Sequence, residues 1–199
     1  MIGSSEKIVV ITGVSSGIGR SIAKKYYEEG YTVCGLDKTR GLDNLPCELY
    51  ICDISNESDV RDVFDKIRKK YEKINYVVNC AGVFFDKKRF LIEDMNLIEW
   101  ERVINNNLTG YMLVTKHSIP LLKKATGDKA IINIASDQAI YPRKRNSAYA
   151  VSKAGIVNFS KASAVELISE KIRVNAVLPA SVKTNFIDKL SDTKEELES

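Results

Sequence analysis

Six short apolar runs, rich in β-branched residues, recur along the chain, and each has the length and composition of a buried strand. They span Ile8 to Thr12, Thr32 to Asp37, Glu48 to Asp53, Ile74 to Cys80, Ala130 to Ser136 and Ile172 to Leu178. Helical patterns occupy the segments between them. This alternation predicts an α/β fold with a doubly wound, parallel, Rossmann-like sheet, in which ligands bind at the carboxyl ends of the strands.

Two helices are clear from their apolar spacing. Ile18, Ile22 and Tyr26 share one face of a segment that follows the first strand. A second helix is expected after Ser55 and Asn56, which are typical of a helix start. The apolar residues that share its face are Val60, Val63, Phe64 and Ile67.

Composition narrows the class of protein. The 199 residues are 44% hydrophobic and contain no linker-like stretch, which predicts a single domain over 1–199 with a charged tail from about residue 187. The net charge of +4, from 30 Lys and Arg against 26 Asp and Glu in mixed order, is too small to indicate nucleic acid as a partner. No window approaches the length of a membrane span, so we expect a cytoplasmic protein with no membrane partner.

The four cysteines contain no C-x-x-C pair, and three of them fall in strand-like runs. They are expected to be reduced packing residues, as in a cytosolic protein. Cys47 and Cys52 could form a metal pair, but the only histidine, His117, lies far along the chain in a helical segment. No metal site is therefore predicted.

The loop from Thr12 to Gly19 reads TGVSSGIG and follows the first strand. Its glycines would let the backbone approach a pyrophosphate at the start of a helix, although the spacing differs from G-x-G-x-x-G and is equally consistent with a tight turn. Asp37 ends the next strand about 20 residues later, where a carboxylate can accept ribose hydroxyls and repel a 2′-phosphate. NAD is therefore favoured over NADP, although Lys38 and Arg40 weaken this inference.

Tyr149 and Lys153, in the stretch YAVSK, would share a helix face, where the ammonium can favour the phenolate. Lowering a tyrosine pKa from about 10 to about 7 requires roughly 4 kcal/mol, which Lys153 and a cationic nicotinamide could supply together. With nine tyrosines, about one such pair is expected by chance, so the context decides. Ser136 ends a strand and can donate to a substrate oxygen, and Asn107 could hold a water or a backbone group.

Taken together, these residues resemble the short-chain dehydrogenase/reductase family over nearly the whole chain. The family's cofactor loop is T-G-x-x-x-G-x-G, which the TGVSSGIG stretch matches at every fixed position. The resemblance implies an NAD-dependent oxidoreductase that interconverts a secondary alcohol and a ketone, or a lactol and a lactone, by hydride transfer. Tyr149 would be the general acid/base, and Lys153 would lower its pKa and bind the nicotinamide ribose. Ser136 would orient the substrate, and Asn107 would anchor a proton-relay water.

The resemblance also implies the residues that bind the cofactor. The loop would contribute Gly13, Ser15, Ser16, Gly17, Ile18 and Gly19. Asp37 would select NAD, and the adenine would be flanked by Asp53 and Ile54. The adenosine ribose side would be lined by Asn79, Ala81 and Gly82. The segment VLPASVKT resembles the family's P-G-x-V-x-T, so the nicotinamide would be contacted by Pro179, Val182 and Thr184.

The chain departs from the family pattern at three places. Cys80 and Ala180 replace an Asn and a Gly, which are small changes expected to leave cofactor binding intact. The sequence also stops at Ser199, before the family's usual last strand, so it is either part of a longer chain or a short member of the family. The run from Ile172 to Leu178 is therefore expected to form an open sheet edge that another subunit of a homo-oligomer covers or pairs.

The residues around Ser136 and before Tyr149 bear on the substrate class. Asp137 and Gln138 lie beside Ser136, and the basic stretch PRKR precedes Tyr149, which suggests a hydroxyl-rich or anionic substrate such as a sugar or a 3-oxoacyl thioester. PRKR is also typical of a solvated loop. The alternative function is a non-catalytic NAD-binding sensor or assembly protein, and an epimerase or dehydratase would need a longer substrate domain.

Overall fold

The computed structural model describes residues 7–41, 46–84 and 90–182. Thr184 and the predicted charged tail lie outside these ranges. None of the helices within them combines the length and the apolar character that crossing a membrane requires.

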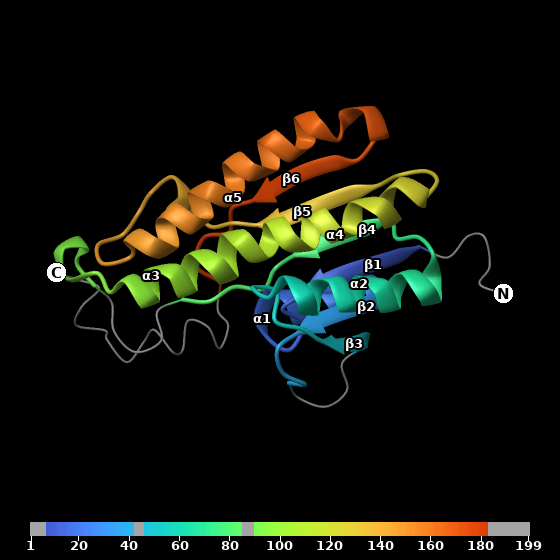
Figure 1. The fold of residues 1–199 in the computed structure, drawn as a ribbon, viewed down its shortest axis with the longest axis horizontal. Helices are drawn as coiled ribbons and strands as arrows, with labels where there is room; N and C mark the ends of the chain where they lie inside the picture. Colours follow the sequence, from blue (N-terminus) through green and yellow to red (C-terminus); the bar gives the residue numbers. More distant parts are fainter. Residues whose placement is uncertain (1–6, 42–45, 85–89, 183–199) are drawn as a thin grey trace.

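A parallel sheet forms the centre of the fold, and the described residues give it six strands (Figure 1). In chain order these are β1 (Ile8–Thr12), β2 (Thr32–Asp37), β3 (Glu48–Ile51), β4 (Tyr76–Asn79), β5 (Ala130–Ile134) and β6 (Arg173–Val177). The order across the sheet is β3-β2-β1-β4-β5-β6, and every neighbouring pair is parallel. The predicted doubly wound α/β fold is confirmed.

Each of the six predicted apolar runs contains one strand, but the last four runs are longer than their strands. β3, β4, β5 and β6 stop one or two residues before the predicted end. The extra residues, among them Asp53, Cys80 and Ser136, belong to the loops that follow the strands. Buried and apolar residues continue into these loops, so the pattern alone does not locate the strand ends.

The direction of winding reverses at β1, which has β2 on one side and β4 on the other. In an open sheet of this kind, the helices that follow the two strands lie on opposite faces and leave a crevice at the carboxyl ends. The register pairs Thr12 with Leu36, and Asn79 with Asn133, so four strands end at the same edge of the sheet. This edge is where the sheet can hold a ligand.

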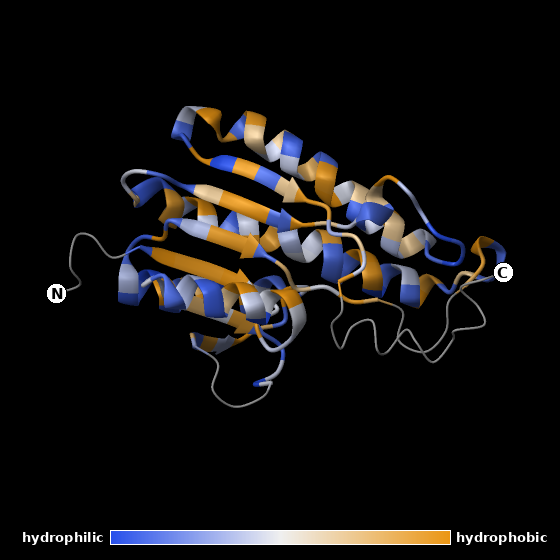
Figure 2. Cartoon of the chain, turned by 180° about the vertical axis from the view of Figure 1, so that it is seen from behind, coloured by the Kyte–Doolittle hydropathy of each residue, from blue (hydrophilic) through white to orange (hydrophobic). Residues whose placement is uncertain are grey.

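Helices cover the two faces of the sheet unequally. The main helices are α1 (Gly17–Glu28), α2 (Glu57–Tyr71), α3 (Leu97–Ile104), α4 (Gly110–Lys124) and α5 (Ser147–Glu166). A π-helical turn, η2 (Asn105–Thr109), joins α3 to α4. Figure 1 shows α2, α4 and α5 on one face, whereas α1 packs on the other face against β1 and β2. Figure 2 shows that second face, where no described helix covers β5 and β6.

The start of α2 shows why the local sequence folds as it does. Asn56 is the N-cap residue, and its side chain accepts a hydrogen bond of 3.0 Å from the backbone N–H of Ser58. The predicted apolar face of this helix is buried against the sheet, which confirms the expected helix and its orientation.

Every residue of β1 is fully buried, as expected for the central strand of a sheet that is covered on both faces. A buried polar chain links the next strands to α5. The Nδ2 of Asn79 donates to Oδ1 of Asn133, and the Nδ2 of Asn133 donates to Oγ of Ser160, each at 2.8 Å. These hydrogen bonds hold β4, β5 and α5 in fixed relative positions beside the carboxyl edge.

Candidate active site

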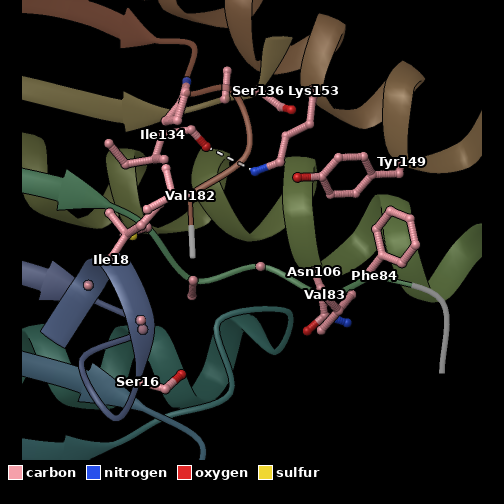
Figure 3. Close-up of a pocket in the computed structure, with 18 of the residues that line it drawn as sticks. Ser16, Ile18, Val83, Phe84, Asn106, Ile134, Ser136, Tyr149, Lys153 and Val182 are labelled. Carbon is pink, nitrogen blue, oxygen red and sulfur yellow. Dashed lines mark hydrogen bonds between the residues drawn. The ribbon is translucent and has the colours of Figure 1, made fainter. Parts of the chain in front are cut away.

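A cavity of about 370 Å³ lies along the carboxyl edge of the sheet (Figure 3). This size is within the usual range for a small-molecule site. The structure brings most of the predicted site residues together around it. They are Gly13, Ser16, Gly17, Ile18, Gly19, Asp37, Ile54, Ala81, Gly82, Ser136, Tyr149, Lys153, Pro179 and Val182.

Four predicted residues lie beside this cavity without lining it: Ser15, Asp53, Asn79 and Asn107. Asn79 is buried within the polar chain between β4 and α5, so its side chain joins β4 to β5 and does not line the cavity. The other three hold neighbouring groups in place, as described below. Thr184 lies outside the described residues.

The glycine loop is tightly folded against the end of β4. Gly13 has a φ of +76°, and a Cβ there would lie 2.8 Å from the Cα of Ala81. A Cβ at Gly19 would lie 2.2 Å from the carbonyl oxygen of Gly13. Only glycine therefore fits at these two positions.

The loop also presents the start of α1 to the cavity. Ser16 is the N-cap of this helix and makes no side-chain hydrogen bond to it, and the residues of the first turn line the cavity. Backbone N–H groups in the first turn of a helix lack partners within the helix and favour an anion. The arrangement fits the pyrophosphate of a dinucleotide.

The end of β2 is fixed by hydrogen bonds to the Asp37 carboxylate. The backbone N–H of Ser15 donates to Oδ2 of Asp37 at 3.0 Å, and the backbone N–H of Thr39 donates to Oδ1 of Asp37 at 3.2 Å. The hydroxyl of Ser15 in turn donates to the Thr39 carbonyl at 2.8 Å. Ser15 therefore joins the glycine loop to β2 and holds Asp37 at the cavity wall.

Lys38 and Asn106 form part of the same wall, and sequence reasoning did not place them there. The Nζ of Lys38 lies 2.8 Å from Oδ2 of Asp53 and donates to Oδ1 of Asn106 at 3.3 Å. Burial would raise the pKa of Asp53, but hydrogen bonds from Lys38 and Ser55 outweigh it, so the pKa of this carboxyl is lowered. Asp53 is therefore an ionised partner that holds the Lys38 ammonium.

Asn107 lies in the π-helical turn and is fully buried. Its Oδ1 accepts a hydrogen bond of 2.8 Å from the N–H of Val83, and its Nδ2 donates to the carbonyl of Val83 at 2.9 Å and to Oγ of Ser152 at 3.2 Å. The side chain thus fixes the loop after β4 against α5. π-turns within helices are frequent at functional sites, as here.

Lys153 is buried at the end of β5 and donates from Nζ to the carbonyl oxygen of Ile134 at 2.9 Å (Figure 3). The same carbonyl accepts a hydrogen bond of 3.1 Å from the hydroxyl of Tyr111. The Nζ lies 5.5 Å from the ring centroid of Tyr149 and 5.6 Å from that of Tyr111. Burial lowers the pKa of Lys153 to about 8, because removal from water disfavours the charged form.

Tyr149 and Ser136 lie beside Lys153 at the same end of the cavity (Figure 3). Burial raises the pKa of Tyr149, and its hydrogen bond with Ser136 acts in the opposite direction. The charge of Asp137 raises this pKa further, whereas that of Arg143 lowers it. The protein alone therefore keeps the phenol protonated, and forming the phenolate requires additional positive charge in the cavity.

Phe84 and Arg102 support the Tyr149 ring, and the sequence carried no signal for either role. The ring of Phe84 contacts that of Tyr149 edge-on, with centroids 4.9 Å apart. Arg102 donates to the carbonyl of Phe84 at 2.6 Å and pairs with Glu99 at 2.9 Å. An edge-on aromatic contact of this kind stabilises the ring position by about 1 kcal/mol.

The buried ammonium of Lys153 makes the stability of the fold depend on pH. Its pKa of about 8 lies below the ordinary value of 10.5, so between these values the unfolded chain binds more protons and the free energy of unfolding rises with pH. From pH 7 to pH 10 we expect the wild type to gain on the order of 2–3 kcal/mol relative to Lys153→Met. Urea denaturation of both proteins at each pH measures this gain.

The matched control is Lys161→Met, which removes an exposed lysine from the same helix. This variant should follow the pH dependence of the wild type. A stability difference between wild type and Lys153→Met that stays constant from pH 7 to pH 10 would contradict the burial of a charged group at this position.

Comparison with known proteins shows which proteins this chain resembles. The 3-oxoacyl-acyl-carrier-protein reductase FabG of Thermotoga maritima is 34% identical over 201 residues, which cover 96% of this chain and 80% of that protein. The ligand-free aldohexose dehydrogenase of Thermoplasma acidophilum superposes with a TM-score of 0.90 at 34% identity, covering 96% of this chain and 73% of that one. A 3-ketoacyl-acyl-carrier-protein reductase from Brucella melitensis, complexed with NADH, superposes with a TM-score of 0.84 at 31% identity. The match covers 94% of this chain and 80% of that one.

The sequence profile of the short chain dehydrogenase family matches residues 7–195. This range includes the glycine loop, the strand that ends at Ser136 and the helix that carries Tyr149 and Lys153. The resemblance drawn from those motifs is confirmed. The chain belongs to the short-chain dehydrogenase family, and it is an NAD(P)-dependent oxidoreductase that acts on CH–OH and carbonyl groups of small molecules.

Proposed function

We propose that the protein uses NAD to oxidise a secondary alcohol or a lactol reversibly to the ketone or lactone. The observation that carries this proposal is the convergence of Tyr149, Lys153 and Ser136 on one end of a cavity whose other end is the glycine loop. Bound NAD would supply the hydride acceptor and, in its oxidised form, a positive charge. The chain supplies the groups that bind it, orient the substrate and move the proton.

Tyr149 would take the hydroxyl proton of the substrate as a general base and return it as a general acid in the reverse direction. Ser136 would hydrogen-bond to the reacting oxygen and hold it next to the phenol. Lys153, fixed by the Ile134 carbonyl, would bind the nicotinamide ribose and add positive charge beside Tyr149. These two charges would offset the effect of burial on the pKa of Tyr149.

Asn107 would contribute by holding the cavity wall and by anchoring a water on the proton path. The hydrogen bonds of its side chain to Val83 and Ser152 support the first role directly. They also place the amide beside Gly82, where a Cβ would lie 3.4 Å from Oδ1 of Asn107 and 3.7 Å from Nζ of Lys153. The glycine leaves room there for a cofactor or a water.

The relatives support a sugar or a 3-oxoacyl thioester as the substrate class, because they include an aldohexose dehydrogenase and 3-oxoacyl-acyl-carrier-protein reductases. The alternative, a non-catalytic sensor or assembly protein, gains no support from them, since they are named as dehydrogenases and reductases.

We also propose that NAD is preferred over NADP. Asp37 lines the cavity at the end of β2, where its carboxylate would accept hydrogen bonds from ribose hydroxyls and repel a 2′-phosphate. Lys38 would not offset this repulsion, because its ammonium is paired with Asp53 and hydrogen-bonded to Asn106.

We further propose that the protein is a cytoplasmic homo-oligomer. No described strand pairs with the outer edge of β6. Val165 and Ile168, which precede this strand, are 74% and 75% exposed. An edge that no described strand pairs with, together with exposed apolar side chains in the segment that leads to it, favours coverage by another subunit. The four cysteines form no disulfide with one another, which supports a reducing compartment.

Substitution of Tyr149 by Phe tests the catalytic assignment. Removing the hydroxyl removes the general base, so we expect turnover to fall at least about a hundredfold. NADH binding, followed by its fluorescence, should remain because the glycine loop is unchanged. Tyr27→Phe, at an exposed position on α1, is the control and should keep full turnover. The assignment is wrong if Tyr149→Phe retains turnover close to that of the wild type.

Substitution of Asp37 by Ser tests the cofactor preference. Removing the carboxylate removes the repulsion of a 2′-phosphate, so the ratio of kcat/KM with NADP to kcat/KM with NAD should rise about tenfold, or about 1.4 kcal/mol. Steady-state kinetics with both cofactors measure this ratio. Asp62→Ser, at an exposed position on α2, should leave it unchanged. A wild-type enzyme that already prefers NADP would contradict the proposal.

Light scattering of the purified protein tests the assembly. The expected mass is a whole multiple of 22.3 kDa that is greater than one. Replacing Val165 and Ile168 together by Asp should reduce that mass, because it places charges in an exposed apolar patch that another subunit would cover. A single species of monomer mass at micromolar concentration would contradict the homo-oligomer.

A further inference from the structure

A carboxylate follows the catalytic serine directly in the chain. The hydroxyl of Ser136 donates to Oδ1 of Asp137 at 2.9 Å, and both residues line the cavity. Asp137 therefore lies one hydrogen bond beyond the group that would contact the reacting oxygen. The proposed mechanism gives this carboxylate no role.

The position of Asp137 is fixed by its backbone. Its N–H donates to the carbonyl of Pro179 at 3.0 Å, and its own carbonyl accepts from the N–H groups of Ile140 and Tyr141 at 3.0 and 2.9 Å. The backbone of Asp137 is thus held by three hydrogen bonds beside the segment that would contact the nicotinamide, and its carboxylate is held by Ser136 and Arg143. A group fixed in this way can select a substrate with little loss of entropy on binding.

The carboxylate also has free capacity to accept hydrogen bonds. An ionised carboxylate has about four acceptor positions and no donor. Ser136 uses one on Oδ1, and Arg143 uses one on Oδ2 through a longer contact of 3.3 Å. The side chain of Asp137 is 28% exposed, so a bound molecule can reach the remaining positions.

The positions of Ser136 and Tyr149 limit which hydrogen-bonding group a bound substrate can offer to Asp137. The reacting oxygen would lie within a hydrogen bond of both Ser136 and Tyr149, which share one end of the cavity (Figure 3). In a vicinal diol with its oxygens gauche, the second oxygen lies about one hydrogen-bond length from the first. That is also the separation of the Ser136 hydroxyl from the Asp137 carboxylate. A hydroxyl on the neighbouring carbon can therefore reach Asp137.

We propose that Asp137 is a specificity-determining residue that accepts a hydrogen bond from the hydroxyl next to the reacting carbinol, so that the enzyme prefers vicinal diols such as aldoses. This inference rests on the proposed function. A 3-hydroxyacyl thioester has no O–H donor on the neighbouring carbons, and its thioester carbonyl is an acceptor that a carboxylate cannot satisfy. The Asp137 carboxylate therefore discriminates between the two substrate classes that the relatives suggest.

A neighbouring amide strengthens the preference for hydroxyl-rich substrates. Gln138 lines the cavity and is buried, and its Oε1 accepts a hydrogen bond of 3.0 Å from Nδ2 of Asn146. This contact fixes the orientation of the amide at the cavity wall. Asp137 and Gln138 thus supply adjacent polar groups on one side of the reacting oxygen, as specific recognition of a polyol requires.

The test compares substrates that differ by one hydroxyl. NADH formation is measured with cyclohexanol, with cis- and trans-1,2-cyclohexanediol, and with the pair D-glucose and 2-deoxy-D-glucose. The DL-3-hydroxybutyryl thioester of coenzyme A represents the other class. In the wild type, we expect kcat/KM to be at least about tenfold higher for the preferred vicinal diol than for its partner without the second hydroxyl. The same preference is established if turnover of the diol is measurable and turnover of the substrate without the second hydroxyl is undetectable.

Two variants assign the preference to the carboxylate. In Asp137→Ala the ratio of kcat/KM within each substrate pair should fall towards one, and in Asp137→Asn, which keeps the shape and one acceptor oxygen, it should be intermediate. Using the ratio cancels any general effect of these changes on Ser136. Asp62→Ala, on the exposed face of α2, is the control and should keep the wild-type ratio. NADH binding and the thermal transition show that each variant is folded.

Two results would overturn the inference while leaving the oxidoreductase assignment intact. One is a wild-type enzyme that uses the hydroxybutyryl thioester or cyclohexanol at least as well as every vicinal diol. The other is an unchanged diol ratio in Asp137→Ala. If no substrate of the panel yields NADH with the wild type, the proposed function fails first and the inference fails with it.

Discussion

The burial of the Lys153 amine at the carboxyl end of β5 is the constraint on which the site depends. An ammonium group removed from water loses much of its hydration, and here one carbonyl, that of Ile134, compensates in part through a 2.9 Å hydrogen bond. Because that carbonyl also accepts from Tyr111 on α4, the sheet, α4 and α5 meet at a single oxygen. The position of Tyr149, one turn earlier on α5, follows from this contact.

Hydrogen bonds behind the cavity wall also position the groups at the end where the adenosine would bind. Ser15 ties the glycine loop to Asp37, and Asp53 holds the ammonium of Lys38. Neither Ser15 nor Asp53 lines the cavity, yet each sets the position or the charge of a residue that does. The proposed preference for NAD would therefore depend on groups that lie behind the surface that a dinucleotide would contact.

The fold could be predicted because the sequence pattern repeats a simple physical rule. Runs of β-branched residues alternate with amphipathic segments, and a parallel sheet covered by helices buries the apolar residues of both. The glycine spacing and the pair of Tyr149 and Lys153 are local features, so the sequence alone was sufficient to predict them as parts of the site. The inward orientation of Asn79, the bracing role of Asn107 and the pairing of Lys38 with Asp53 depend on contacts between distant elements. No local pattern encodes such contacts.

In the proposed reaction, proton removal by Tyr149 would accompany hydride transfer in a cavity that supplies the missing positive charge. The most direct measurement is the rate of NADH formation in a single turnover at saturating NAD, as a function of pH, with carbinol-protiated and carbinol-deuterated substrate. We expect a rate that rises with pH to a plateau, as Tyr149 loses its proton, and a plateau that deuteration lowers. A rate that is independent of pH and insensitive to deuteration would contradict this mechanism.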